Sequence, residues 1–167
     1  MRIHDGITTL RRLHPDDQPV FLAYRNDPDV ARYQSWPQMT AAETAGFLHH
    51  CATIDPLLRP DHWTQIAVAN TATDALIGDM GLHLSADGSE AEIGITLQAA
   101  SQRMGHATRA MRLAVDHLFQ TTDITRIIAG ADARNTPSLA LIRRLGFVQT
   151  GVTTVDGVTE IDFEVVR

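Results

Sequence analysis

The order in which strands and helices are expected between residues 64 and 145 constrains the fold of this chain most. Apolar-rich segments separated by turn-forming residues predict an antiparallel meander of three strands: Thr64–Asn70, Ala75–Leu84 and Glu90–Leu97. Apolar residues at helical spacing then run from Met104 to Leu118, with the helix ending near Thr121. A β-branched strand over Ile124–Ala131 and a helix over Thr136–Leu145 follow. This order predicts an α/β (α+β) fold with a mixed, mostly antiparallel sheet.

The flanking segments extend this sheet. Thr8–Leu13 is expected to be a strand, and Pro15-Asp16-Asp17 is expected to open a helix that stops near Asp27-Pro28. A short helix is expected over Asp29–Tyr33, and Thr40 with Glu43 predicts a capping box for a helix reaching Thr53. Two strands joined at Asp156-Gly157 close the chain: Phe147–Thr153 and Thr159–Val166. The whole pattern predicts about seven strands flanked by about four helices.

Length and composition limit the classes of protein and of site. The 167 residues are close to one domain length, so we expect a single domain over residues 1–167. The single cysteine, Cys51, excludes an internal disulfide and a zinc site built on paired thiolates. All 14 basic residues are arginine, and the lack of lysine excludes a Walker P-loop and a lysine Schiff base. No two of the eight histidines stand four residues apart, and we expect no metal site.

The net charge of −6 argues against non-specific binding to nucleic acid or to an anionic membrane, and favours a cationic partner such as an amine. No apolar run approaches the roughly 18 residues of a membrane span, and the first residues lack the apolar run of a signal peptide. We therefore expect a soluble, cytoplasmic protein with no nucleic-acid or membrane partner.

The segment Gln102–Thr108 lies between a predicted strand and a predicted helix. The first turn of a helix carries unpaired N–H donors and a partial positive charge, and the small residues Gly105 and Ala107 let a phosphate approach that backbone. Arg103 adds a positive charge. On these residues alone, the segment is either a phosphate-binding site or a glycine-containing tight turn.

Two motifs resemble a known superfamily. Gln102-x-x-Gly105-x-Ala107, following Glu92–Leu97, resembles the acetyl-coenzyme A motif of the GNAT N-acetyltransferases. Asn135-Thr136-Pro137-Ser138, with Leu145-Gly146-Phe147 after it, is similar to the signature of the branch that acetylates the N-termini of ribosomal proteins, including the ribosomal-protein-alanine enzymes. The resemblance covers essentially the whole chain and implies a GNAT-like acyl-CoA N-acyltransferase fold. It also implies transfer of an acetyl group from acetyl-CoA to a primary amine, on a protein N-terminus or a small molecule.

The resemblance also implies a set of cofactor-binding residues. Strand residues would follow the pantetheine arm: Ile95, Thr96 and Leu97. Backbone N–H groups would hold the pyrophosphate along the run after the strand: Arg103, Met104, Gly105, His106, Ala107 and Thr108. Asn135 would reach the pantetheine or an ordered water, although a polar residue before a helix is equally an N-terminal cap.

The catalytic candidates are Glu92 and Ser138. Glu92 occupies the strand position at which histone-type relatives carry a carboxylate base; the alternative is a surface glutamate on a half-solvated sheet. Many superfamily members supply a tyrosine proton donor in the last helix, but the matching residue here is Ile142. In the ribosomal-protein branch a serine serves instead, which Ser138 matches; the alternative is a serine that only bonds local backbone.

Acceptor-binding candidates come from the early helices and the meander. Family members line the acceptor cleft with the segment that here holds Tyr33 and Trp36. Trp36 either walls this cleft or packs the first helices onto the sheet. Asp79 either faces a cationic amine or faces water. Relatives often form homodimers, but the sequence does not show whether this chain does. A non-catalytic acyl-CoA sensor or scaffold is the alternative function, since the tyrosine is missing.

Overall fold

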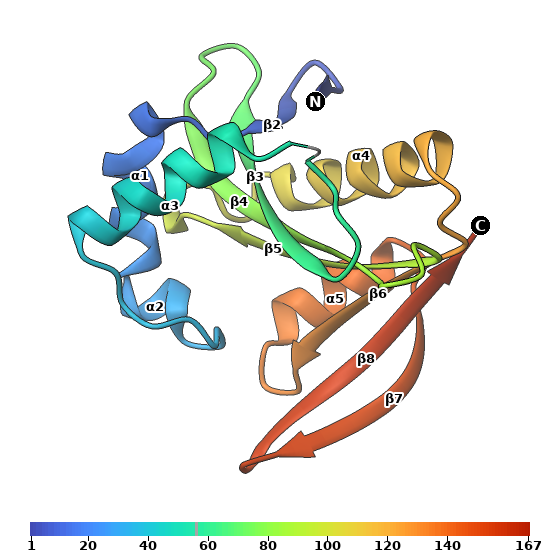
Figure 1. The fold of residues 1–167 in the computed structure, drawn as a ribbon. Coiled ribbons are helices and arrows are strands. Elements are labelled where there is room, and N and C mark those ends of the chain that lie inside the picture. Colours follow the sequence, from blue (N-terminus) through green and yellow to red (C-terminus); the bar gives the residue numbers. More distant parts are fainter. Residues whose placement is uncertain (56) are drawn as a thin grey trace.

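The computed structural model describes residues 1–55 and 57–167, and these form one sheet of eight strands with five α-helices against it (Figure 1). The strand order is β1-β2-β3-β4-β5-β6-β8-β7, and among these described strands β5 and β6 form the parallel pair. The strands are β1 (Arg2–His4), β2 (Thr8–Arg12), β3 (His62–Asn70), β4 (Leu76–Leu84), β5 (Glu90–Leu97), β6 (Arg126–Asp132), β7 (Val148–Val155) and β8 (Val158–Val166). The predicted mixed α/β fold is confirmed.

The helices cover the sheet unevenly. α4 (His106–Thr121) and α5 (Thr136–Arg144) pack on one face, where the main core includes Met80, Ile93 and Met111. α1 (Gln18–Arg25) and α3 (Ala41–Thr53) cover the other face over β3 and β4, with the short α2 (Pro28–Ala31) beside them. On this second face α1 and α3 do not extend across β6 and β8 (Figure 1). Outward-facing side chains of β6 and β8 therefore border open space.

The strands β5 and β6 part from one another along their length (Figure 1). They pair only where Glu90–Glu92 lies beside Arg126–Ile128, although β5 continues to Leu97 and β6 to Asp132. Beyond Glu92, β5 is hydrogen-bonded to β4 on one side. The backbone groups that β5 turns toward β6 in this stretch have no strand partner there, so they are available to a ligand.

Local sequence signals explain most element boundaries. The Thr40–Glu43 capping box is confirmed, and the Asp156-Gly157 turn has the two positive φ angles, 50° and 79°, that suit a tight hairpin. The predicted β5 bounds are confirmed. The prediction lacked β1 and started α4 too early: Arg103 and Gly105 adopt left-handed φ angles of 62° and 86°, so the helix begins only at His106. Among the described residues, no helix is long and apolar enough to cross a membrane.

Candidate functional site

Two adjoining cavities lie where β5 and β6 part. The first, of about 670 Å³, lies between the N-termini of α4 and α5, and we call it the helix-end cavity. The second, of about 710 Å³, lies against the sheet face that α1 and α3 leave uncovered, and we call it the sheet-face cavity. Both are lined by Thr96 of β5 and by Asn135 and Ser138 at the start of α5. These three belong to a wall that the cavities share, which also includes Tyr33 and Arg134, so molecules in the two cavities would adjoin along it.

The helix-end cavity has the features of an anion site. Gly105 is the N-cap of α4 with φ of 86°, and a Cβ added there would meet no atom within 4 Å. The backbone can thus be approached closely, and the first N–H groups of the 16-residue helix α4 have no helical partner. Four arginines also line the cavity: Arg32, Arg103, Arg134 and Arg144. Backbone donors and guanidinium groups together suit phosphate oxygens.

Most of the predicted cofactor residues line this cavity: Ile95, Thr96, Leu97, Arg103, Gly105, Ala107, Thr108 and Asn135. Met104 and His106, for which backbone N–H contacts are expected, are not among the lining residues. Met104 is 66% exposed, and His106 is buried, with its Nδ1 2.8 Å from Thr8 Oγ1. The early left-handed turn directs the His106 ring into the core against β2, so only main-chain atoms of these two residues remain near the helix end.

The first turn of α5 brings Asn135 and Ser138 to the junction of the cavities. Asn135 is the N-cap of α5, and its Oδ1 accepts a hydrogen bond from the Ser138 N–H at 3.3 Å. The capping alternative is therefore confirmed, and the residue borders both cavities as well. Ser138 is half-buried and borders both. Ile142, one turn further along, is buried and lines the sheet-face cavity with an apolar side chain.

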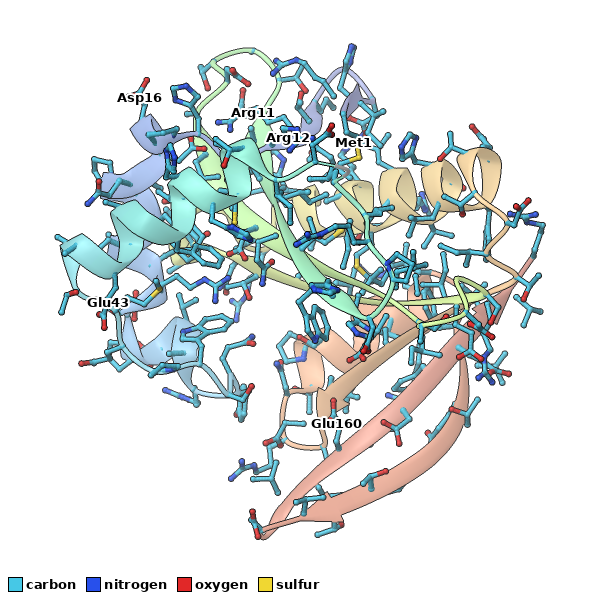
Figure 2. The ribbon with its side chains drawn as sticks, in the orientation of Figure 1. Met1, Arg11, Arg12, Asp16, Glu43 and Glu160 are labelled. Atoms are coloured by element: carbon cyan, nitrogen blue, oxygen red, sulfur yellow. The ribbon has the colours of Figure 1, made fainter. Side chains whose placement is uncertain are left out.

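Glu92 and Glu160 supply carboxylates to the sheet-face cavity. Glu92 is half-buried; burial raises the pKa of its carboxyl, and Glu160 raises it further, while His83 opposes the shift. Burial, Asp162 and Asp132 raise the pKa of Glu160. The Glu160 side chain lies over β6 because Gly130 leaves room: a Cβ on Gly130 would stand 2.2 Å from Glu160 Oε1 (Figure 2). The raised pKa makes Glu92 a stronger base than an exposed glutamate.

Both alternatives for Asp79, a cationic amine and water, are corrected. The residue is 2% exposed, and its carboxylate accepts a hydrogen bond of 2.6 Å from Tyr24 Oη and forms an ion pair with Arg25. Burial raises the pKa of Asp79, whereas Arg25 and Tyr24 lower it. The cation that Asp79 contacts is thus a side chain of α1. Trp36 completes this cluster, with the Arg25 guanidinium 3.9 Å from its ring centroid and a hydrogen bond from its Nε1 to the Arg25 carbonyl.

The packing alternative for Trp36 is confirmed, and the residue lines a cavity as well. It is half-buried and fixes α1, and it also lines the sheet-face cavity. Tyr33 lines both cavities, with the Arg134 guanidinium 5.7 Å from its ring centroid. In the part of the chain that the structure describes, no three His, Cys, Asp or Glu residues are grouped to hold a metal ion. Cys51 is buried, and burial raises the pKa of its thiol to about 11.

Among the cavity residues that sequence reasoning missed are Gln65, Arg144 and Glu160. For Glu160 a signal exists, since Glu160, Asp162 and Glu164 alternate along the last strand with Ile161, Phe163 and Val165. That alternation indicates an acidic face. Arg144 carries no such signal, because the charged face of a surface helix has the same pattern whether or not a ligand lies beside it.

Comparison with known proteins gives one family. A family model described as "Acetyltransferase (GNAT) domain" matches residues 8–148. The "Uncharacterized N-acetyltransferase p20" of Bacillus licheniformis is 28% identical over 145 residues, which cover 86% of this chain and 80% of that protein.

Two solved structures illustrate the shared fold. A GNAT-family acetyltransferase from Bacillus anthracis superposes with a TM-score of 0.87 at 20% identity, over 99% of this chain and 98% of that one. The ribosomal-protein-S5-alanine acetyltransferase of Vibrio fischeri superposes with a TM-score of 0.81 at 18% identity, over 99% and 96%. At these identities the likeness shows the fold.

Proposed function

The chain belongs to the GNAT family of N-acetyltransferases, and from that premise we propose that it transfers the acetyl group of acetyl-CoA to a primary amine by direct attack in a ternary complex. The observation that carries the proposal is the meeting of two cavities, one lined by an anion-binding helix end and one by carboxylates, at Thr96, Asn135 and Ser138. A ternary complex requires two ligands whose reacting ends touch. Two adjoining cavities allow one ligand to bind in each, with the reacting ends in contact.

The helix-end cavity fits acetyl-CoA. The open space at Gly105 and the free N–H groups of α4 suit the pyrophosphate, with Arg103 and Arg144 as countercharges. The β5 backbone beyond Glu92, which has no strand partner toward β6, suits the amide groups of the pantetheine arm. When bound, the cofactor supplies an acetyl thioester as the electrophile.

Two side chains are proposed to transfer protons in the reaction: Glu92 and Ser138. We propose that Glu92 accepts the proton that the amine loses as its nitrogen bonds to the acetyl carbon and the carbon–sulfur bond breaks. Its raised pKa makes it a stronger base than an ordinary glutamate. Ser138 borders both cavities and holds a hydroxyl proton where the departing sulfur would take one up. Tyr33 and Trp36 form aromatic walls for the amine.

The acceptor is either a small amine or a peptide amino terminus. The motif Asn135–Ser138 and the likeness to the Vibrio fischeri enzyme support the peptide, while the acidic lining of the sheet-face cavity supports a cationic small amine. Both classes carry a primary amine.

The test is release of free thiol from acetyl-CoA in the presence of a panel of small amines and short peptides. We expect turnover above the buffer rate with at least one amine, and loss of turnover in Glu92→Gln. Acetyl-CoA binding without thiol release from any amine would replace the transferase proposal with the acyl-CoA sensor. Glu92→Gln with an unchanged rate and pH profile would remove Glu92 from the mechanism.

A further inference from the structure

The sheet-face cavity carries more negative charge than its arginines compensate. Four acidic residues line it, Asp79, Asp132, Glu92 and Glu160, against three arginines, Arg25, Arg32 and Arg134. Within the described part of the chain each arginine already has a carboxylate partner: Arg25 pairs with Asp79, Arg134 with Asp132, and Arg32 with Asp29. Among these residues, Glu92 and Glu160 have no such ion pair. Two uncompensated carboxylates therefore face one cavity.

Two other acids on the same sheet face are compensated: Arg126 lies between Glu90 and Glu164, with contacts of 2.6 and 3.1 Å. Glu164 shares its strand and its face with Glu160 but lies outside the cavity lining. Asp162, between them on β8, has no ion pair among the described residues, but it accepts a hydrogen bond of 3.0 Å from Thr153 Oγ1. The structure gives the carboxylates of Glu92 and Glu160 neither kind of partner in its described part, and both line the cavity.

An independent feature of the same wall points to a ligand with N–H donors. The Gln65 Oε1 atom is buried and has no hydrogen-bond partner among the described residues, and its side chain lines the cavity. It lies over Gly81, where an added Cβ would stand 3.3 Å from both ends of the Gln65 amide. A buried carbonyl oxygen without a donor is costly, and a ligand N–H would satisfy it. Trp63 adds an aromatic face, which attracts cations, whereas Trp36 already has the Arg25 guanidinium on its ring.

The two carboxylates are separated along the sheet. Glu92 lies beside Ile128 in the β5–β6 register, and the Glu160 carboxylate lies on Gly130, two residues further along β6. With strands about 4.8 Å apart and a rise of about 3.3 Å per residue, the backbones of Glu92 and Gly130 stand about 8 Å apart. Because the strands diverge here, this backbone spacing leaves room for one short aliphatic chain with a cationic group near each carboxylate.

We infer that the acceptor is a dicationic amine, an aliphatic diamine or a longer polyamine, whose reacting nitrogen lies at Glu92 and whose second ammonium is held by Glu160. The inference rests on the proposed function and names its acceptor class. It adds Glu160 as a specificity residue that touches the part of the acceptor that does not react.

The experiment compares 1,4-diaminobutane with 4-aminobutan-1-ol, which has the same length and one ammonium group fewer. Thiol release is measured with the full chain at saturating acetyl-CoA. The kcat/KM of the diamine is expected to be roughly ten- to a hundredfold higher than that of 4-aminobutan-1-ol. The diamine makes one more charge-assisted contact, between its second ammonium group and Glu160. Glu160→Gln is expected to bring this ratio close to one. Glu164→Gln, the matched control on the same strand and face, is expected to keep it.

The outcomes separate the inference from the function on which it rests. If none of the amines or peptides causes thiol release, the proposed function is overturned. Equal kcat/KM values for the two small amines, a ratio unchanged in Glu160→Gln, or preference for an uncharged peptide N-terminus would overturn the dicationic acceptor alone. The melting temperature and acetyl-CoA affinity of each variant show whether it is folded, so a misfolded variant is not mistaken for a change in specificity.

Discussion

Replacing Asp79 by asparagine should destabilise the fold strongly, because it removes the charge that compensates a buried arginine. The Arg25 and Asp79 side chains are 6% and 3% exposed. The Arg25 guanidinium lies between two aromatic rings, 4.9 Å from the Phe21 centroid and 3.9 Å from the Trp36 centroid. Asparagine keeps the volume and can still accept the Tyr24 hydrogen bond, so the change isolates the charge.

The expected loss follows from the burial of both partners. Leaving one member of a buried ion pair without its countercharge typically costs about 3 to 5 kcal/mol. For a chain of this length, about 2 to 4 °C of melting temperature accompany each kcal/mol, so Tm should fall by roughly 6 to 20 °C. The matched control is Asp74→Asn, whose side chain is 53% exposed and pairs with Arg2 and with Arg11, and Arg11 keeps its second partner, Asp17. An exposed pair of this kind is worth about 0 to 1 kcal/mol.

Urea unfolding followed by circular dichroism measures both variants against the parent chain. The reasoning is refuted if Asp79→Asn loses no more stability than Asp74→Asn. Kinetics add a second readout: if Asp79→Asn is as stable as the parent but raises the KM of the amine tenfold, Asp79 is a substrate contact after all. Replacing the pair together by apolar residues, Arg25→Met with Asp79→Leu, should recover most of the lost stability, because no unpaired charge is left.

Three further predictions follow from the site. Glu92→Gln should lower kcat by about 10²- to 10⁴-fold and remove the acidic limb of the pH–rate profile. In the parent chain the midpoint of that limb should lie above the usual glutamate pKa. If the limb persists in the variant, it belongs to another group. Gly78→Ala should cost about 1 to 3 kcal/mol and weaken acetyl-CoA binding, because the new Cβ would stand 2.1 Å from the Thr96 carbonyl oxygen and push β5 away; unchanged calorimetric affinity would contradict this. The pKa of Asp132 is lowered from 3.8 to about 2, chiefly by the hydrogen bond from Arg134. Its contribution to stability is therefore present above pH 3.8 and is lost as the pH falls toward 2. Asp132→Asn should make the free energy of unfolding depend less on pH in that window, and an unchanged acid-unfolding curve would refute this.

The fold was largely predictable because its signals are local. The Thr40–Glu43 box, the alternation along Glu90–Leu97 and the Asp156-Gly157 turn each act through neighbouring residues. The start of α4 was missed because Met104 fits the apolar spacing of a helix, whereas the left-handed Arg103 and Gly105 prevent that helix from reaching it.

The partners of the site residues were not predictable in the same way. Asp79 meets Tyr24 and Arg25, which lie more than fifty positions away in the sequence, so its burial and ion pair depend on how α1 docks on the sheet. Glu160 reaches the cavity only because Gly130 on the neighbouring strand lacks a side chain. Contacts of this kind arise from tertiary packing, and a single sequence shows residue types without showing which of them meet.

The most direct test of the central claim is calorimetric titration of the purified chain with acetyl-CoA. Our account predicts saturable binding of one molecule per chain at the helix-end cavity, weakened when Arg103 and Arg144 are both replaced by alanine. Absence of binding by the folded parent chain, or binding that this double replacement leaves unchanged, would contradict the assignment of that cavity to the cofactor.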